Sequence, residues 1–407
     1  MSVLRDKTVV VGVSGGIAAY KAAELVRLLV RAGARVRVMM TRAAPQFITP
    51  LTLQTLSGAP VATDVLSLVE EAQIGHIRIA DSADAIVIAP ASADLLARMA
   101  LGMADDVVTA VLLAARCPVA VAPAMNVHMY EHPAVRENLA RLAARGVVVI
   151  EPEEGELACG YEGKGRLPDP RAIVEEVERM LSRHDLAGER VLVSAGPTQE
   201  AIDPVRYVSN RSSGKMGFAL AAAAWRRGAS VRLVSGPSAL SAPPGVERID
   251  TVSAGQMLSA VAESFSWCSI LVMAAAVADF RPAQPAAQKL KKSGRAMTLE
   301  LAPVADELPA LAAGKEDRLI VGFAAETHDL EAQALAKLER KRLDLICAND
   351  VTMPGAGFAA DTNVVTLLDA TGRVERLPLL SKEEVADRIF DRVLELKNAQ
   401  GASAANR

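Results

Sequence analysis

The chain has 407 residues, 51% of them hydrophobic, and this length is typical of two or three domains that each bury a core. Its 45 basic and 48 acidic residues give a net charge of −3, and only 3% of its residues are aromatic, which argues against a nucleic-acid-binding protein. The N-terminus lacks the parts of a secretory signal peptide and the apolar runs are too short to span a bilayer, so we expect no membrane partner.

The four cysteines, Cys117, Cys159, Cys268 and Cys347, lie far apart and form no C-x-x-C pair. This spacing is typical of reduced thiols in a cytoplasmic protein, and not of a disulfide framework or a zinc site. We therefore predict a cytoplasmic location. The sequence identifies no set of metal ligands.

The first part of the chain predicts a strand, a helix and a second strand. A continuous β-branched run at 8–13 is typical of a buried parallel strand, and an amphipathic helix ending at Gly33 leads into a strand at 35–41. Further segments extend this half: strands are predicted at 85–90, 118–124 and 147–150, and a helix at 171–183.

The same pattern returns in the second half, where RRGASVRLVSG closely echoes the earlier RAGARVRVMMT. Strands are predicted at 190–196, 230–236, 269–276, 319–326 and 344–350, followed by a hairpin around Ala370–Gly372 and a helix that starts with a capping box at Ser381 and Glu384. We predict an α/β protein with two Rossmann-like doubly wound domains, residues 1–189 and 190–398, and a disordered tail at 399–407.

Two loops of the first half could contact a phosphate or a flat ring. The turn Gly15, Gly16 and Ile17 lies between a strand and a helix, where backbone amides can bind an anion, although a plain tight turn is the alternative. G-x-G-x-x-G is absent and the second strand ends at Thr41 instead of an acidic residue, so a mononucleotide fits better than NAD. The segment from Ser92 to Leu95 could bind a polar ring or simply cap a helix.

Three further residues of this half have reactive or polar side chains in loops. Asn126 follows a strand at the end where open α/β sheets bind ligands, and it could hold a carboxylate. Cys159 lies in a Gly-rich loop with nearby cations, which favours an acidic thiol over a buried inert one. His76 precedes a strand, and a lone histidine is more often structural.

The second half contains several groups suited to an anionic ligand. The long loop 195–217 contains Arg206 and Asn210, and Asp279 follows a strand where a Mg²⁺-nucleotide or a ribose could bind. The loop 277–298, long for a compact domain, contains Lys289. Lys337 and Lys341 lie one helical turn apart, and a solvated helix face is the plainer explanation for them.

Together, PAMNVHMY, ACGYEGKGR, AGPTQEAIDPVRYVSNRSSGKMG and DLICAND, in that order, resemble the bacterial bifunctional phosphopantothenoylcysteine decarboxylase/phosphopantothenate–cysteine ligase family of coenzyme A synthesis. The resemblance runs from about residue 5 to residue 398. It implies an N-terminal flavodoxin-like flavoprotein domain of the homo-oligomeric, flavin-containing cysteine decarboxylase (HFCD) type and a C-terminal Rossmann-like ligase domain.

The resemblance implies a CTP-dependent ligation of cysteine to 4'-phosphopantothenate through an acyl cytidylate, with Mg²⁺. An FMN-dependent decarboxylation of phosphopantothenoylcysteine to 4'-phosphopantetheine then follows. In such families the flavin lies at trimer contacts and the ligase half dimerises, which implies a large homo-oligomer, for example a dodecamer.

The family's functional residues match positions of this sequence. The implied FMN contacts are Gly15, Gly16, Ile17, Thr41, Ser92, Ala93, Asp94 and Leu95. His76 matches the base, Asn126 the residue that holds the substrate carboxylate, and Cys159 the proton donor. Asn210 and Arg206 match residues that handle the acyl intermediate. The implied nucleotide contacts are Asp279, Lys289, Pro303, Val304, Ala305, Asp306, Phe323, Lys337 and Lys341.

One segment departs from the family pattern. The family often has Lys-x-Pro-Asp after the long loop, whereas residues 301–311 read LAPVADELPAL and lack the lysine, which weakens the contacts assigned from Pro303 to Asp306. Two other functions stay open: a nicotinamide-dependent dehydrogenase, which the missing ribose carboxylate disfavours, and a flavin-binding regulatory protein without activity. The combination of His76, Asn126 and Cys159 with a complete ligase half disfavours the second.

Overall fold

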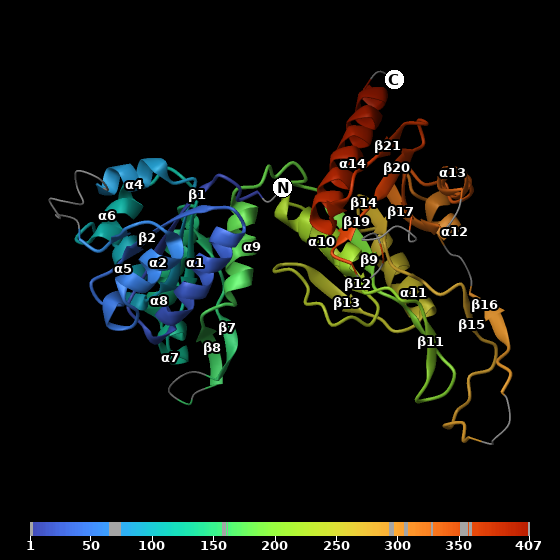
Figure 1. Ribbon diagram of the computed structural model, residues 1–407, viewed down its shortest axis with the longest axis horizontal. Coiled ribbons are helices and arrows are strands. Elements are labelled where there is room, and N and C mark those ends of the chain that lie inside the picture. Colours follow the sequence, from blue (N-terminus) through green and yellow to red (C-terminus); the bar gives the residue numbers. More distant parts are fainter. Residues whose placement is uncertain are drawn as a thin grey trace. The chain divides into compact units, whose positions relative to one another are not determined.

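The computed structural model describes residues 3–64, 75–156, 160, 162–292, 297–304, 308–326, 329–350, 357 and 360–405. The chain forms two compact units, Met1–Arg183 and His184–Arg407, each built around a central sheet with helices on both faces (Figure 1). This arrangement confirms the prediction of two doubly wound α/β domains.

The sheet of the first unit has the strand order β3-β2-β1-β4-β5-β6, with all strands parallel. Its strands are β1 (Thr8–Val13), β2 (Arg35–Met40), β3 (Val61–Ala62), β4 (Ala85–Ala91), β5 (Val119–Pro123) and β6 (Val148–Val149). This is the Rossmann order, in place of the order 2-1-3-4-5 that flavodoxins have. The order reverses between β1 and β4, the position where such sheets bind ligands.

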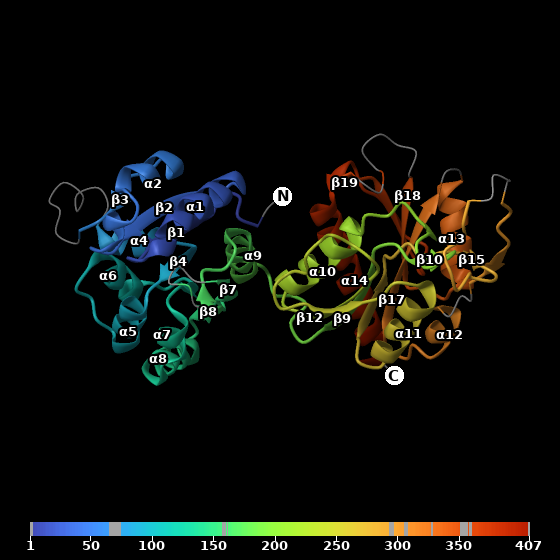
Figure 2. The same ribbon diagram turned by 90° about the horizontal axis from the view of Figure 1, so that it is seen from below.

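Alternate residues of these strands point to opposite faces, because the side-chain period of a strand is two. Val9 and Val11 lie in one buried cluster with residues of α1 (Ala22–Arg31), α2 (Pro50–Ser57) and α9 (Pro170–Met180). Val10 and Ile88 lie in the other cluster. Figure 2 shows α1 and α2 together on one side of the sheet. The helices of that second face are α4 (His76–Ser82), α5 (Ala93–Leu101), α6 (Val107–Ala114) and α8 (Pro133–Ala144).

The second sheet repeats the order of the first and adds two antiparallel strands. Its order is β13-β12-β9-β14-β17-β18-β20-β21, and the pairs from β13 to β18 are parallel. The strands are β9 (Arg190–Ala195), β12 (Ser230–Ser235), β13 (Glu247–Asp250), β14 (Ile270–Met273), β17 (Leu319–Glu326), β18 (Leu345–Asp350), β20 (Val365–Asp369) and β21 (Val374–Arg376). The predicted hairpin is confirmed, with Gly372 at φ 86° in its turn.

Helices cover both faces of this sheet. One cluster joins the sheet to α10 (Lys215–Arg226) and α14 (Lys382–Ala405), and the other joins it to α11 (Ala254–Phe265), α12 (Leu308–Ala313) and α13 (Leu330–Arg340). Small hairpins project from the unit: β10 (Gln199–Ala201) pairs with β11 (Tyr207–Ser209), and β15 (Phe280–Pro282) pairs with β16 (Leu301–Pro303). Near α14, β19 (Thr362–Asn363) pairs with β22 (Leu380–Ser381).

The echo between the two halves of the sequence corresponds to one repeated turn. Gly33 after α1 and Gly228 after α10 have φ angles of 92° and 94°. In both turns the residue after the glycine donates its amide hydrogen to the carbonyl five residues earlier: Ala34 to Leu29 at 3.1 Å, and Ala229 to Ala224 at 3.0 Å. A left-handed backbone favours glycine, so both sequences need it at this point.

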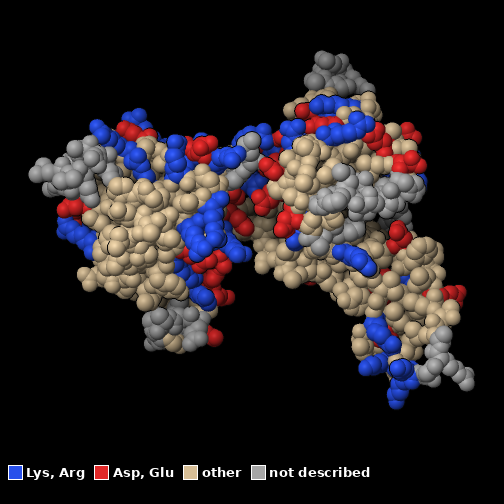
Figure 3. All heavy atoms as spheres, in the orientation of Figure 1, with Lys and Arg blue, Asp and Glu red and all other residues tan. Residues whose placement is uncertain are grey.

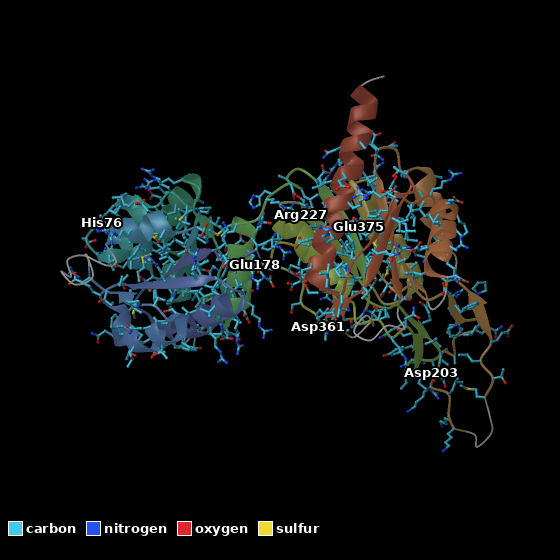
Figure 4. All side chains as sticks on the ribbon, turned by 45° about the horizontal axis from the view of Figure 1, so that its top comes forward. His76, Glu178, Asp203, Arg227, Asp361 and Glu375 are labelled. Atoms are coloured by element: carbon cyan, nitrogen blue, oxygen red, sulfur yellow. The ribbon has the colours of Figure 1, made fainter. Side chains whose placement is uncertain are left out.

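The domain boundary and the C-terminal tail differ from their predictions. The boundary lies after Arg183 instead of after residue 189, because Leu186 is buried in the core of the second unit and Asp185 pairs with the buried Arg227 at 2.7 Å (Figure 4). The capping box is confirmed, since Ser381 and Glu384 each accept the other's amide hydrogen. Residues 399–405, for which the sequence predicts a disordered tail, continue α14.

Candidate functional sites in two units

The loops that follow β1 and β4 meet at the carboxyl edge of the first sheet. The Ser14 hydroxyl donates to the Pro90 carbonyl at 2.8 Å and accepts the Ser92 amide hydrogen at 2.8 Å. A Cβ on Gly15 would lie 2.5 Å from the Ala43 Cβ, so only glycine allows the turn after β1 to approach the segment after β2. The predicted residues Gly15, Thr41 and Ser92 therefore lie at one edge.

The environment of this edge fits a flavin nucleotide. A Cβ on Gly16 would meet nothing within 4 Å, which leaves open space beside the backbone. Ile17 and Tyr20 are 65% and 60% exposed although both are largely apolar, and a ring system could cover them. The helix-cap alternative is confirmed for Ser92, whose hydroxyl accepts the Leu95 amide hydrogen at 3.3 Å.

Asp94 differs from the other residues predicted for this edge. Its side chain is 80% exposed and lies 3.8 Å from Arg98, one turn along α5. Arg98 also pairs with Asp105 and Asp106, and the Asp94 side chain stays exposed to solvent beside it. The Asp94 carboxylate is thus solvated within this chain.

Asn126 lies at the first turn of α7 (Val127–Glu131), against the hairpin of β7 (Glu153–Glu156) and β8 (Glu162–Arg166). Its side-chain oxygen accepts the His128 amide hydrogen at 2.9 Å. A Cβ on Gly165 would lie 2.3 Å from the Met125 carbonyl oxygen, so β8 can pack this closely only with glycine there. Cys159 belongs to the connection between β7 and β8 and lies outside the described residues.

His76 is the first residue of α4, on the face covered by α4 and α6 (Figure 4). A helix that enters a parallel strand starts at the carboxyl edge of the sheet, so His76 lies at the same edge as the Gly15 turn. Its Nδ1 atom is buried and has no hydrogen-bond partner among the described residues.

The second unit has a cavity of about 940 Å³ at the carboxyl ends of β9, β14 and β17. It opens where the strand order reverses between β9 and β14. The residues from the sequence prediction that line it are Asn210, Asp279, Val304, Phe323, Lys337 and Lys341. Distant segments of the chain therefore come together here, as the resemblance implies for a nucleotide site.

The wall of this cavity beside α10 depends on close backbone contacts. A Cβ on Gly217 would lie 2.4 Å from the Ala195 Cβ, so the first turn of α10 packs directly on β9. Asn210 donates from its side-chain amide to the carbonyls of Ala276 and Val277, at 3.0 and 3.3 Å. The predicted role of Asn210 at the reacting carboxylate is thus compatible with its place at the end of β14.

The wall formed by α13 is basic. Lys337 and Lys341 both line the cavity, so they do not form a merely solvated helix face. The Lys337 ammonium donates to the Phe323 carbonyl at 2.8 Å and links α13 to β17. A phosphate or a base in the cavity would meet these cations.

Several cavity residues were missed by the sequence analysis as site residues, among them Asn349, Asn363 and Lys382. Lys215, whose charge in the loop 195–217 suits an anionic ligand, also lines the cavity. Lys215 pairs with Asp361 at 2.6 Å, and Lys382 donates to the Ala360 carbonyl at 2.5 Å. Burial and the nearby Lys215 lower the pKa of Lys382. Asn349 could have been found, because it belongs to the DLICAND motif, whereas nothing in the sequence links Lys382 to the earlier strands.

Other predicted residues do not line the cavity. Arg206 instead pairs with Asp203 at 2.5 Å, Lys289 is exposed on the long loop, and Pro303 pairs with Phe280 at the base of that loop. Ala305 and Asp306 lie outside the described residues.

Among the residues that the structure describes, no group of three or more histidine, cysteine or acidic side chains could hold a metal ion. No described helix is long and apolar enough to cross a membrane.

Comparison with known proteins gives both halves of the chain a family. Residues 2–182 match the family model "Flavoprotein", and residues 186–396 match "DNA/pantothenate metabolism flavoprotein C-terminal domain". The chain is 50% identical over 393 residues to the coenzyme A biosynthesis bifunctional protein CoaBC of Vibrio cholerae, covering 96% of this chain and 98% of the relative. It is 48% identical over 402 residues to CoaBC of Bacillus subtilis, covering 98% and 99%.

A solved structure of a C-terminal domain of CoaBC is 40% identical, covers 52% of this chain and 97% of that chain, and has a TM-score of 0.45. The full-length relatives confirm the resemblance and leave the dehydrogenase and the inactive flavoprotein without support. The chain therefore belongs to the CoaBC family of bifunctional coenzyme A biosynthesis enzymes, in which a flavoprotein decarboxylase domain is joined to a ligase domain.

Proposed function

We propose that the second unit ligates cysteine to 4'-phosphopantothenate with CTP and Mg²⁺, and that the first unit decarboxylates the product with FMN to give 4'-phosphopantetheine. One observation supports both parts. In each unit, candidate residues from distant segments gather at the carboxyl edge of a sheet where the strand order reverses, beside β1 and β4 or beside β9 and β14.

In the first unit, the residues of the Gly15 turn and the Ser92 segment would hold FMN. When bound, FMN supplies the oxidation of the substrate thiol that makes loss of carbon dioxide possible, and the later reduction. Asn126 would hold the substrate carboxylate, His76 would act as the base, and Cys159 would protonate the carbon that has lost its carboxyl group. The close packing of β8 on the Asn126 segment would keep Cys159 and Asn126 near one substrate.

In the second unit, the chemistry has to activate a carboxylate, which is a poor electrophile. The substrate carboxylate would attack the α-phosphate of CTP, with loss of pyrophosphate, to give an acyl cytidylate; the cysteine amine would then displace CMP. Lys337 and Lys341 in the cavity, with Lys289, would offset negative charge on the phosphates. Mg²⁺ would arrive with the triphosphate, because a hard cation of this kind binds phosphate oxygens readily.

The homo-oligomer and the cytoplasmic location stay predictions. Exposed apolar side chains on the first unit, Ile77 on α4 and Leu113 on α6, are 52% and 62% exposed and support a surface that a second copy would cover.

One assay tests the whole proposal. Purified full-length protein is incubated with 4'-phosphopantothenate, cysteine, CTP and Mg²⁺, and the products are identified by mass, with pyrophosphate and bound flavin measured in parallel. We expect a yellow protein and conversion to 4'-phosphopantetheine, with ATP supporting less turnover than CTP. A protein that never binds FMN, even after reconstitution, contradicts the first half, and the absence of CTP-dependent pyrophosphate release contradicts the second.

A further inference from the structure

The long loop that contains Lys289 is an excursion between β15 and β16. At its base the Val304 amide donates to the Asp279 carbonyl at 2.9 Å, and both residues line the cavity. The loop then projects beside the β10–β11 hairpin, where basic side chains gather (Figures 1 and 3). Exposed loops in proteins are generally mobile, so the Lys289 side chain can keep one position only if other residues hold the backbone next to it.

One buried carboxylate connects the turn of the β10–β11 hairpin to this loop. Asp203 is 3% exposed (Figure 4). Its Oδ1 accepts the amide hydrogens of Val205 and Arg206, both at 2.8 Å, and these two bonds shape the turn. Its Oδ2 accepts the amide hydrogen of Leu290, the residue after Lys289, at 3.1 Å. One oxygen of the Asp203 carboxylate therefore holds the hairpin turn, and the other holds the long loop.

Arg206 strengthens the same connection. Its guanidinium donates to Asp203 Oδ2 from Nε at 3.0 Å and from Nη2 at 2.5 Å, and Nη2 also donates to the Leu290 carbonyl at 2.6 Å. The Arg206 guanidinium holds the pKa of Asp203 well below its usual range, so the carboxylate is ionised at neutral pH. Leu290 is therefore held through both its amide and its carbonyl.

A second hydrogen bond holds the loop on the other side of Lys289. The Ala286 amide donates to the Ile202 carbonyl at 2.9 Å, from the residue before Asp203. Lys289 therefore lies between two backbone positions, Ala286 and Leu290, that are both attached to the same hairpin turn. The other end of that hairpin leads to Asn210 at the cavity.

We propose that Asp203 is a positioning residue for the ligase reaction: it holds Leu290, and through it Lys289, in the arrangement that binds the nucleotide phosphates. This inference rests on the proposed function, in which Lys289 contacts CTP. Arg206 acts in the same connection, which explains why it lies outside the cavity although it matches a residue that handles the acyl intermediate.

Asp203→Asn tests the proposal with little change in volume. The side-chain oxygen of asparagine can still accept the Val205 and Arg206 amide hydrogens, whereas its NH₂ group would face two donors, the Leu290 amide and the Arg206 guanidinium. Loss of a charged hydrogen bond of this kind predicts a KM for CTP that is about tenfold to a hundredfold higher, with a smaller change in kcat. Hydrogen exchange at Leu290 should be at least about tenfold faster.

Asp369→Asn is the matched control. Asp369 is also buried, accepts the amide hydrogens of Thr371 and Arg373, and pairs with an arginine, Arg392, but it holds the turn after β20 and does not contact the long loop. The Asp369→Asn variant should lower the stability of the second unit. Hydrogen exchange at Leu290 and the KM for CTP should stay as in the parent protein. The decarboxylase activity and the flavin content should be unchanged in both variants.

The outcomes separate the two proposals. Unchanged Leu290 exchange in Asp203→Asn, or a KM for CTP equal to that of the parent protein, overturns the positioning role. Near-normal pyrophosphate release in Lys289→Gln instead overturns the phosphate contact itself, whatever Asp203→Asn does. If Asp203→Asn raises the KM for CTP by the full factor also in the Lys289→Ala background, where the cation is absent, Asp203 does not act through Lys289.

Discussion

The Lys164 ammonium of β8 lies 2.5 Å from the Glu151 carboxylate, which follows β6. Glu151 also accepts a hydrogen bond from the Tyr130 hydroxyl of α7 at 2.9 Å. Although burial opposes ionisation, these two bonds lower the pKa of Glu151. The β7–β8 hairpin is thereby attached to α7, the helix that follows Asn126.

Lys164→Gln should therefore affect the reaction more than the fold. Both partners are partly exposed, so loss of the pair should lower the free energy of unfolding by less than about 1 kcal/mol. Decarboxylation should slow by about tenfold, because a small displacement of a proton donor is costly, while flavin content stays the same. Glu137→Gln, which removes the exposed pair with Arg141 on α8, is the control and should leave the rate unchanged. Equal rates in both variants would remove the role of the pair.

Tyr130 should ionise at a higher pH than an unperturbed tyrosine, whose pKa is about 10. Burial and the hydrogen bond to Glu151 raise the pKa of Tyr130 to about 12. Because the folded pKa is raised above the usual value of about 10, the stabilisation is present below pH 10 and is lost as the pH rises through 12. Ultraviolet titration of Tyr130→Phe should match that of the parent protein up to about pH 10.5 and fall below it afterwards. A loss of absorbance change near pH 10 in the variant would contradict this assignment.

Cys159→Ser should bind FMN and convert phosphopantothenoylcysteine only as far as an oxidised, decarboxylated species that accumulates. The reason is that a serine hydroxyl, with its far higher pKa, is a poor proton donor in place of a thiol. Product analysis by mass with time measures this. Cys117→Ser is the control, since Cys117 is a free, half-buried thiol whose pKa burial raises. Complete turnover by Cys159→Ser would show that another group donates the proton.

Two glycines in the first turns of helices should respond oppositely to alanine. A Cβ on Gly217 would lie 2.9 Å from the Ala195 Cα, so Gly217→Ala should move α10 and cost about 1–3 kcal/mol of unfolding free energy. In Gly255→Ala the nearest atom would be 4.0 Å away, and the change should be neutral or stabilising by up to about 1 kcal/mol. Urea unfolding followed by tryptophan fluorescence reports on this unit alone, because both tryptophans, Trp225 and Trp267, lie in it. Equal midpoints would contradict the close packing of α10 on β9.

Local patterns predicted the strands and the turns well. The β-branched run at 8–13 is buried on both faces, and Gly33 and Gly228 have the left-handed backbone that their shared sequence suggests. The tail is harder to predict, because small polar residues are compatible with both a frayed end and a helix, and a preceding helix such as α14 supplies a nucleus that they can extend.

Local sequence pattern indicates site residues best where they stand in loops directly after strands, whereas Phe323 within β17 and Lys337 within α13 were predicted through the family resemblance. Asp279 and Asn210 follow this rule and line the cavity, whereas Lys215 and Lys382 enter it from the starts of two helices that are far apart in sequence. The connection from Asp203 to Leu290 spans a long stretch of chain and has no periodicity or motif that marks it. Arg206 was singled out for its charge, but only the folded chain shows that its partner is a carboxylate of its own hairpin.

The division of the chain after Arg183 has a consequence for how the two activities are supplied. The buried clusters of the described residues each belong to one unit, so neither unit borrows core residues from the other. The covalent linkage between the units fixes their stoichiometry, because every translated chain contains one decarboxylase domain and one ligase domain. A gene split at this junction and expressed as two polypeptides would keep both folds and lose that equality.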